Sequence, residues 1–492
     1  MSKNIKSIVS RGLILVSLLA MGCGGAKGAG GAKSGDQAGV AVGPDGQRVI
    51  SKKAREDFQD AVEKWKAAEK AGWTEASCKS MADDFKNLAK RYNNMQEALY
   101  NVGVVYRKCN MEKEAREAFN ETLSKHPNHQ LAMTQLAVMH LEKGEMQAGE
   151  DMLRKAVGAG MATLEAVPAY VNAATILRMK ASQKSGGDDE SFQKAQMNLR
   201  RALAIDSKYM PALYQLAMLY LDMAITKKKK SYLTLASLVC TQGIGLDPEY
   251  GPIYHALGQV FLHKNQLVKA LQSFETAFKK DPNLFASYMN FGAINLNFRG
   301  YQEAKMAFEK AIALDPKSYD AHIGLGVALR GLEDYEGAKA EYKKASEIDP
   351  KRTDFIFNMG VLEMDYLNNG TPEGYEKAKA VFKKFLNKAN DNHRVDPDGK
   401  GGQISWVDKA QKRVEQCDKN IEMIKQAEQE MREMEKLAAE QAKREAEAKA
   451  AMERAKELEK KEAAGEQAPE GAEGAEGTAE GTADAQAGAE SK

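Results

Sequence analysis

The strongest constraint on the fold of this chain is a set of small residues that recur every 34 positions. Gly258, Gly292, Gly326 and Gly360 form this series. Each of the first three is followed at fixed distances by an alanine, an aromatic residue and an Asp-Pro pair: Ala270, Ala304 and Ala338; Phe274, Phe308 and Tyr342; Asp281-Pro282, Asp315-Pro316 and Asp349-Pro350. A repeat of this length predicts stacked helical hairpins, each burying its apolar face on its neighbours. Small residues are expected where two helices touch, and proline ends the second helix.

The same register continues upstream and resembles the tetratricopeptide-repeat (TPR) pattern. It predicts eight repeats over residues 96–390, opening near 96, 130, 167, 210, 251, 285, 319 and 353, with long inter-helix loops at 183–191 and 226–231. Residues 51–95 are interpreted as a degenerate ninth unit or an N-terminal cap, because a solenoid needs its exposed end covered. The resemblance implies an all-α right-handed superhelix of about eight to nine hairpins.

The N-terminus carries a targeting signal rather than a folded element. Residues 1–22 combine a basic start with a short apolar run and end just before Cys23, which resembles a bacterial lipobox. The resemblance implies that Cys23 is lipidated and that residues 23–50, rich in glycine, form a flexible tether. The alternative is an ordinary signal peptide with an accidental cysteine.

Four further cysteines are present, and no pair of them has the spacing of a metal site. Cys78 and Cys109 fall on helices that should be neighbours, and an exported compartment permits disulfides. A bridge between them and two separate buried thiols are both open interpretations.

The C-terminal part of the chain differs from the repeats. Residues 391–403 are expected to form a loop, and residues 404–463 a long charged helix whose first apolar positions dock on the last repeat. Its second part suits a thin partner contact or a weak coiled coil. Residues 464–492 are acidic Gly/Ala/Glu repeats that cannot bury a core, and we expect them to be disordered.

Composition and motifs argue against several functional classes. The chain has 71 Lys plus Arg against 69 Asp plus Glu, so it lacks the concentrated basic field that nucleic acids require. No phosphate loop, nucleophile elbow or zinc-protease motif occurs, and we expect no catalysis, cofactor, metal ion or small-molecule substrate. Lys227–Lys230 is the one dense basic cluster, interpreted either as a contact for anionic headgroups or an acidic partner, or as a solvated turn.

The resemblance to TPR proteins implies that the first helix of each hairpin lines a concave groove that binds partner proteins. The inward positions, counted from each small residue, are Tyr100, Val104, Arg107, Thr134, Val138, Tyr214, Met218, His255, Gln259, Met289, Ala293, Ile323, Val327, Arg330, Phe357 and Val361, with Lys108, Leu262 and Leu296 as further candidates. This stripe is mainly apolar and lacks the Lys/Asn clamp that grips chaperone tails. It therefore predicts an amphipathic or extended apolar ligand segment, with the chain's own C-terminal helix as the alternative occupant.

The overall layout is similar to the TPR lipoprotein of the myxobacterial adventurous gliding-motility machinery. That resemblance implies a scaffold, lipid-anchored at the periplasmic face of the outer membrane, that binds other cell-envelope proteins. The inner membrane is the alternative location. Two other functions stay open: an assembly factor for outer-membrane barrels or pilus secretins, and an accessory regulator of cell-wall synthesis enzymes.

Overall fold

The computed structural model describes residues 40–42, 48–93, 95–158, 163–184, 186–367, 370–389, 395–397 and 403–465. The expected signal peptide, Cys23, most of the tether and the acidic tail after residue 465 lie outside these residues and stay predictions. The chain divides into two compact units, residues 1–355 and 356–492.

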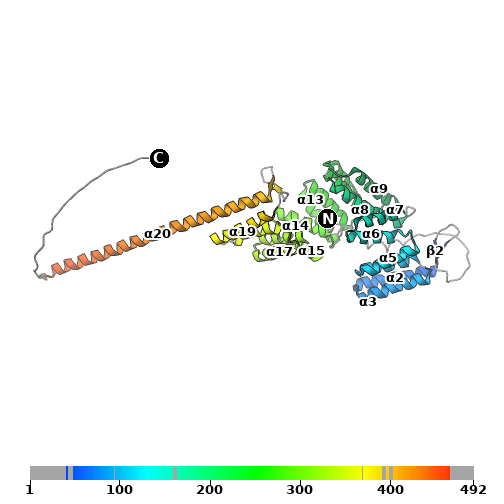
Figure 1. The fold of residues 1–492 in the computed structure, drawn as a ribbon, viewed down its shortest axis with the longest axis horizontal. Helices are drawn as coiled ribbons and strands as arrows, with labels where there is room; N and C mark the ends of the chain where they lie inside the picture. The colour runs from blue at the N-terminus through cyan, green and yellow to red at the C-terminus, as the bar shows by residue number, and fades with distance from the viewer. Residues whose placement is uncertain are drawn as a thin grey trace. The chain divides into compact units, whose positions relative to one another are not determined.

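The first unit is built from antiparallel helical hairpins that follow one another along the chain (Figure 1). From α4 onward, the first helix of each hairpin (helix A) packs on the second (helix B), and helix B contacts helix A of the next. The pairs are α2 (Lys52–Ala71) with α3 (Glu75–Arg91), α4 (Gln96–Lys108) with α5 (Glu112–Lys125), α6 (Gln130–Glu142) with α7 (Met146–Gly158), α8 (Val167–Gln183) with α9 (Asp189–Ile205), α10 (Met210–Lys227) with α11 (Ser231–Leu246), α12 (Gly251–His263) with α13 (Leu267–Lys280), α14 (Phe285–Asn297) with α15 (Tyr301–Leu314), and α16 (Tyr319–Gly331) with α17 (Tyr335–Ile348). A short 3-10 turn, η1 (Leu164–Ala166), precedes α8. The predicted all-α hairpin fold is confirmed.

The recurring glycines are the contact points between the two helices of a hairpin. A Cβ atom added at Gly258 would lie 2.7 Å from the ring of Phe274, and one at Gly326 would lie 2.4 Å from the ring of Tyr342. Phe308 lies between Gly292 of its own hairpin and Gly324 of the next. The repeat aromatic therefore packs within its own hairpin as well as against its neighbour, and only glycine leaves room for it.

Aspartate side chains build the turns that join one hairpin to the next. Asp281 Oδ1 accepts the backbone N–H of Asn283 at 3.0 Å, and Asp315 Oδ1 accepts that of Lys317 at 3.1 Å. Such turns satisfy backbone donors beyond the helix end, and the following proline cannot continue the helix. The Asp-Pro pair thus sets where each helix B stops.

The prediction of a long loop at 226–231 is wrong. Helix α10 continues to Lys227, and only residues 228–230 connect it to α11. The extra residues of this repeat therefore lengthen the helices instead of the loop. This costs less, because an added helical residue keeps its backbone hydrogen bond. In the preceding repeat a loop remains, and it is shorter than expected, between Gln183 and Asp189.

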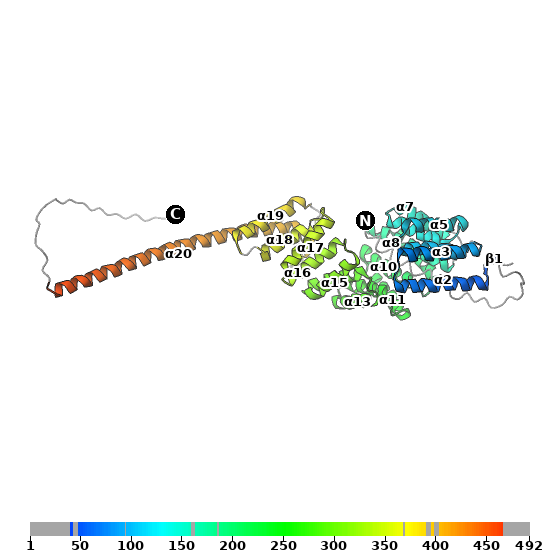
Figure 2. The same ribbon diagram turned by 90° about the horizontal axis from the view of Figure 1, so that it is seen from below.

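A disulfide links the N-terminal hairpin to the next one. Cys78 on α3 is bonded to Cys109 at the end of α4, with the Cα atoms 6.4 Å apart. The bridge therefore replaces the alternative of two separate thiols. Helices α2 and α3 lie antiparallel beside each other (Figure 2), with Phe58, Trp65 and Phe85 buried in the same hydrophobic cluster.

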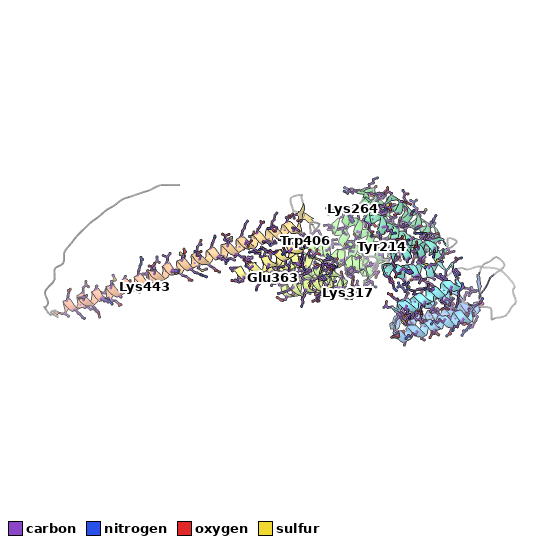
Figure 3. All side chains as sticks on the ribbon, viewed as in Figure 1. Tyr214, Lys264, Lys317, Glu363, Trp406 and Lys443 are labelled. Carbon is purple, nitrogen blue, oxygen red and sulfur yellow. A yellow bond between two sulfur atoms is a disulfide. The ribbon has the colours of Figure 1, made fainter. Side chains whose placement is uncertain are left out.

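The second unit holds the last hairpin and the long helix. Helix α18 (Asp354–Leu362) continues into a π-helical turn, η2 (Glu363–Leu367), and α19 (Pro372–Lys388) packs against α20 (Trp406–Ala463). The expected docking is confirmed: Trp406, Val414 and Ile421 are buried. Every residue from Lys425 to Gly465 is exposed. Figure 3 labels Trp406 at the docked end of α20 and Lys443 on the exposed stretch.

Two short β-hairpins lie outside the helical repeats, in segments expected to be irregular. Strand β1 (Val40–Val42) pairs with β2 (Arg48–Ile50), at the end of the expected tether. Strand β3 (Val395–Pro397) pairs with β4 (Gln403–Ser405), so α20 begins at Trp406 and not at residue 404. The helix starts there because Ser405 caps it, its hydroxyl accepting the N–H of Asp408 at 3.0 Å.

Candidate protein-binding surface

Most of the predicted groove residues that stay at least half-exposed lie on helix A of the last three hairpins in the first unit. Helices α14 and α16 lie beside each other. Ala293 on α14 is exposed, and the neighbouring groove side chains are half-buried. We call this set the helix-A surface: Gln259, Leu262, Met289, Ala293, Leu296, Ile323, Val327 and Arg330. Its apolar majority and partial exposure suit contact with an apolar segment of another protein.

Arg330 adds a hydrogen-bonding group at the end of the helix-A surface. Its Nη1 atom is buried and has no hydrogen-bond partner in the described residues. Arg330 as a whole is half-buried, and a guanidinium group pairs well with carboxylate and carbonyl oxygens. Arg330 is therefore the polar side chain of this surface best placed to orient a ligand.

The groove prediction is wrong for the first two repeats. Tyr100, Val104, Thr134 and Val138 are all buried. Helix α6 is apolar on nearly every side, and its neighbour α8 covers it. Tyr100 stacks on His129 at a centroid distance of 5.2 Å and so belongs to the core.

Arg107 is held inside the fold. Its guanidinium donates to both carboxylate oxygens of Glu142, at 2.7 and 2.9 Å. The two side chains, 10% and 16% exposed, come from α4 and α6 and tie neighbouring hairpins together. The prediction that Arg107 contacts a partner is therefore replaced by a role in the stacking of repeats. Lys108 likewise pairs with Glu69 at 2.7 Å.

The same ion pair recurs two hairpins later. Arg178 on α8 donates to Asp222 on α10 at 2.5 Å, and Ser182 donates to the same carboxylate at 2.9 Å. Both arginines stand four residues after the small residue of their helix A. Both acids stand five residues after the small residue of the next helix A. This pair was not predicted from the sequence, although the offset is visible once the repeats are aligned.

His255 is also a core residue and not a groove contact. It is buried, and its Nδ1 lies 2.9 Å from Ser287 Oγ. Burial lowers the pKa of His255 to about 4, so the imidazole is neutral near pH 7. Tyr214 and Met218 on α10 are half-buried, and desolvation raises the pKa of the Tyr214 hydroxyl.

The last predicted groove residues lie in the second unit, where α20 partly covers them. The Phe357 ring lies 4.5 Å from the Trp406 ring and contacts Phe382 and Phe385 as well. Val361 stays half-buried. Coverage by the chain's own C-terminal helix therefore applies to Phe357, through the first turn of α20.

Comparisons with known proteins identify the repeat. Residues 300–355 and 113–162 each match a family model described as tetratricopeptide repeat. The chain carries tetratricopeptide repeats. No curated protein matches it in sequence. Among solved structures it is similar to MamA from Desulfovibrio magneticus RS-1, with 20% identity over 35% of this chain and 94% of that one, at a TM-score of 0.31. It is also similar to YrrB, titled a TPR protein with an unusual peptide-binding site (23% identity, 41% of this chain, 95% of that chain, TM-score 0.29), and to Pseudomonas aeruginosa pilF (17%, 46%, 95%, 0.36).

A cavity of about 440 Å³ lies at the N-terminal end of the TPR array, beside the disulfide. Its lining includes Trp73, Lys108 and both bridged cysteines. The indole N–H of Trp73 is buried without a hydrogen-bond partner in the described residues. No sequence pattern predicts this cavity, because it forms where α3, the end of α4 and the turn after α2 meet.

Within the part of the TPR chain that the structure describes, no His, Cys, Asp and Glu side chains gather as a metal site. The free thiols of Cys240 and Cys417 are buried, and desolvation raises their pKa values to about 12 and about 11. Both are protonated at neutral pH. In the same residues, no helix is both long and apolar enough to cross a bilayer.

Proposed function

We propose that this chain is a lipid-anchored periplasmic scaffold that binds cell-envelope proteins through its helix-A surface. TPR arrays bind proteins, and the observation that carries the proposal is the accessible apolar stripe on α12, α14 and α16. The ligand that fits this stripe is an apolar or amphipathic segment. The half-buried Arg330 would donate to a carboxylate or carbonyl oxygen of that segment.

The cysteine chemistry supports an exported location. A bridge such as Cys78–Cys109 persists in oxidising compartments and is rare in a reducing cytosol. The lipobox-like sequence before Cys23 predicts that this cysteine carries diacylglycerol, which would hold the chain at a membrane. We place the anchor in the outer membrane, with the repeats in the periplasm.

The biological role that we propose is in the gliding-motility machinery. Its support is the layout of the chain: a glycine-rich segment after Cys23, TPR hairpins with lengthened third and fourth units, and a long charged C-terminal helix. The exposed part of α20, residues 425–463, offers a second contact surface for the same complex. This surface is a weakly apolar stripe of side chains that includes Met431 and Met434.

The first experiment tests the anchor. Membrane fractionation of the wild type is compared with Cys23→Ala, and we expect the variant to move to the soluble periplasmic fraction. A variant that pellets with the outer membrane as before would refute lipid anchoring. The control is Cys240→Ala, which removes a buried thiol and leaves Cys23 in place.

The second experiment tests the binding surface in living cells. A photo-crosslinking residue at Ala293 or Val327 is compared with one at Ala313, an exposed position on helix B of the same region. We expect crosslinks to motility-complex subunits from the first two positions only, weakened by Arg330→Met. Crosslinks to barrel-assembly or secretin subunits, or to peptidoglycan synthases, would replace the motility role with an assembly or cell-wall role. Equal crosslinking from all three positions would refute the surface itself.

A further inference from the structure

Helix α11 has an exposed face with no charged residue. None of its sixteen residues, Ser231–Leu246, is Asp, Glu, Lys or Arg. Its inner side is buried through Leu233, Ala236 and Cys240. Its outer side nevertheless exposes Leu235 by 40% and Leu238 by 65%. A helix face that exposes leucines and carries no charge is often a contact surface, so the outer face of α11 is a candidate for one.

The equivalent helix of the next repeat shows what a solvent-facing helix B carries here. Thirty-four residues after Leu235, Leu238 and Thr241 stand Lys269, Gln272 and Glu275 on α13. The remaining exposed positions of α11 are Ser231, Thr234, Thr241, Gln242, Gly245 and Leu246. The repeat architecture therefore does not require an uncharged outer face, and α11 is an exception within its own array.

A cluster of positive charge lies at the start of this face. Lys228, Lys229 and Lys230 form the turn before α11, all three are exposed, and no acidic side chain pairs with them in the described residues. Lys227 differs, because it pairs with Asp189 on α9. The expected four-lysine cluster is therefore three accessible lysines.

One more cation lies along the side of α11. Lys264 Nζ donates to Ser237 Oγ at 2.7 Å (Lys264 is labelled in Figure 3). At the far end of the helix, the carboxylate of Glu249 is already paired with Lys280. Cations thus lie at the start and along the side of the exposed leucines, whereas the acidic residues, Asp247 and Glu249, lie beyond the far end of the helix.

We propose that the outer face of α11 and the lysine turn before it form a peripheral binding site for an anionic phospholipid surface. Leu235 and Leu238 would enter the boundary between headgroups and acyl chains, while Lys228–Lys230 contact lipid phosphates. Lysine suits this task because its flexible apolar stem reaches past the leucines to the phosphate layer. A protein-binding hot spot would instead be marked by exposed Trp, Tyr or Arg, and the outer face of α11 has none.

This contact does not depend on the lipid at Cys23, and so it is tested without that lipid. Full-length Cys23→Ala protein is mixed with phosphatidylcholine vesicles that contain or lack phosphatidylglycerol, and the bound fraction is measured by sedimentation. We expect binding only to the anionic vesicles, weakening as salt is raised. The anchor proposal can fail while this binding persists, or the reverse, so the two are distinguishable.

Two variant sets locate the site. Replacing Lys228, Lys229 and Lys230 together by Gln should lower the partition coefficient by about 100-fold, since each lysine near an anionic surface contributes about a fivefold effect. Leu235→Gln with Leu238→Gln should lower it by at least about tenfold. Matched controls remove the same charge or apolar groups elsewhere: Lys310, Lys317 and Lys343 to Gln, and Met306 with Leu332 to Gln, all exposed positions.

Circular dichroism checks that every variant keeps its helices. The proposal is overturned if the control sets weaken binding as much as the site sets, or if neutral vesicles bind equally well. It is also overturned if the leucine pair leaves vesicle binding unchanged yet abolishes a crosslink between α11 and an envelope protein. That result would make α11 a protein-docking face.

Discussion

Removing the carboxylate of Glu142 should weaken the stacking of the first two full repeats. In Glu142→Gln, the guanidinium of Arg107 keeps its charge and its place between α4 and α6. Of the two carboxylate oxygens at 2.7 and 2.9 Å, one becomes an uncharged amide oxygen and the other an NH2 group that cannot accept a hydrogen bond. Its Nε atom is already buried without a partner. Breaking a fully buried ion pair costs ~3–5 kcal/mol. Because these side chains are 10% and 16% exposed, water recovers part of that, and we expect a loss of ~2–3 kcal/mol in the free energy of unfolding.

An exposed ion pair serves as the control for the buried Arg107–Glu142 pair. Lys279 and Glu275 form an i,i+4 pair at 2.5 Å with side chains 66% and 43% exposed. Glu275→Gln should therefore cost less than ~1 kcal/mol. Replacing both partners, as Arg107→Met with Glu142→Leu, should recover most of the loss, because an apolar pair of similar volume is often as stable as a buried ion pair.

The assay must report on this part of the array, since repeat proteins unfold locally. Urea denaturation followed by circular dichroism gives the global effect, and hydrogen exchange of the α4 and α6 amides gives the local one. If Glu142→Gln changes neither more than Glu275→Gln does, the ion pair does not hold the hairpins together. If Arg107→Met abolishes crosslinking from Ala293 while exchange stays normal, Arg107 is a partner contact after all.

Three further perturbations follow from the packing and the titrations. Gly326→Ala should destabilise the chain by ~0.5–2 kcal/mol in urea melts, because the clash of a methyl group 2.4 Å from the buried Tyr342 ring outweighs the gain in helix propensity. Gly245→Ala, which has open space around it, should stabilise the chain. A gain in stability from both variants would contradict the role of Gly326 as a helix contact. Reducing the Cys78–Cys109 bridge should lower the free energy of unfolding by ~3–4 kcal/mol, since it closes a loop with a sequence separation of 31. In thermal melts, reductant should lower the melting temperature of the wild type and leave that of Cys78→Ala/Cys109→Ala unchanged. A wild-type melting temperature that does not change with reductant would count against the bridge. The pKa of His255 is about 4 in the fold, below the value of 6.5 expected in the unfolded chain. The unfolded chain therefore binds more protons between these pH values, and the free energy of unfolding falls as pH drops through that window. His255→Gln should make this pH dependence less steep, and an equally steep profile in the variant would show that other groups cause it.

The periodic part of this protein can be predicted from its residue pattern alone. The 34-residue series of glycines, alanines and aromatics gave the hairpins and placed their helix starts within a residue of those observed at 96, 210, 285 and 354. This works because each repeat contacts only its neighbours, so a local pattern carries nearly all the packing information. The Asp-Pro pairs are equally local, since they act on the turn in which they stand.

Which side chains reach solvent, and which pair across repeats, depends on the packing of the folded chain. Tyr100, Thr134 and His255 occupy the same helix face as Ala293, yet neighbouring helices bury the first three and leave the last exposed. The reason is that exposure depends on how closely successive A helices approach, which the side chains of two repeats set together. The same holds for the disulfide, whose choice over two separate thiols depends on a Cα separation of 6.4 Å between α3 and the end of α4.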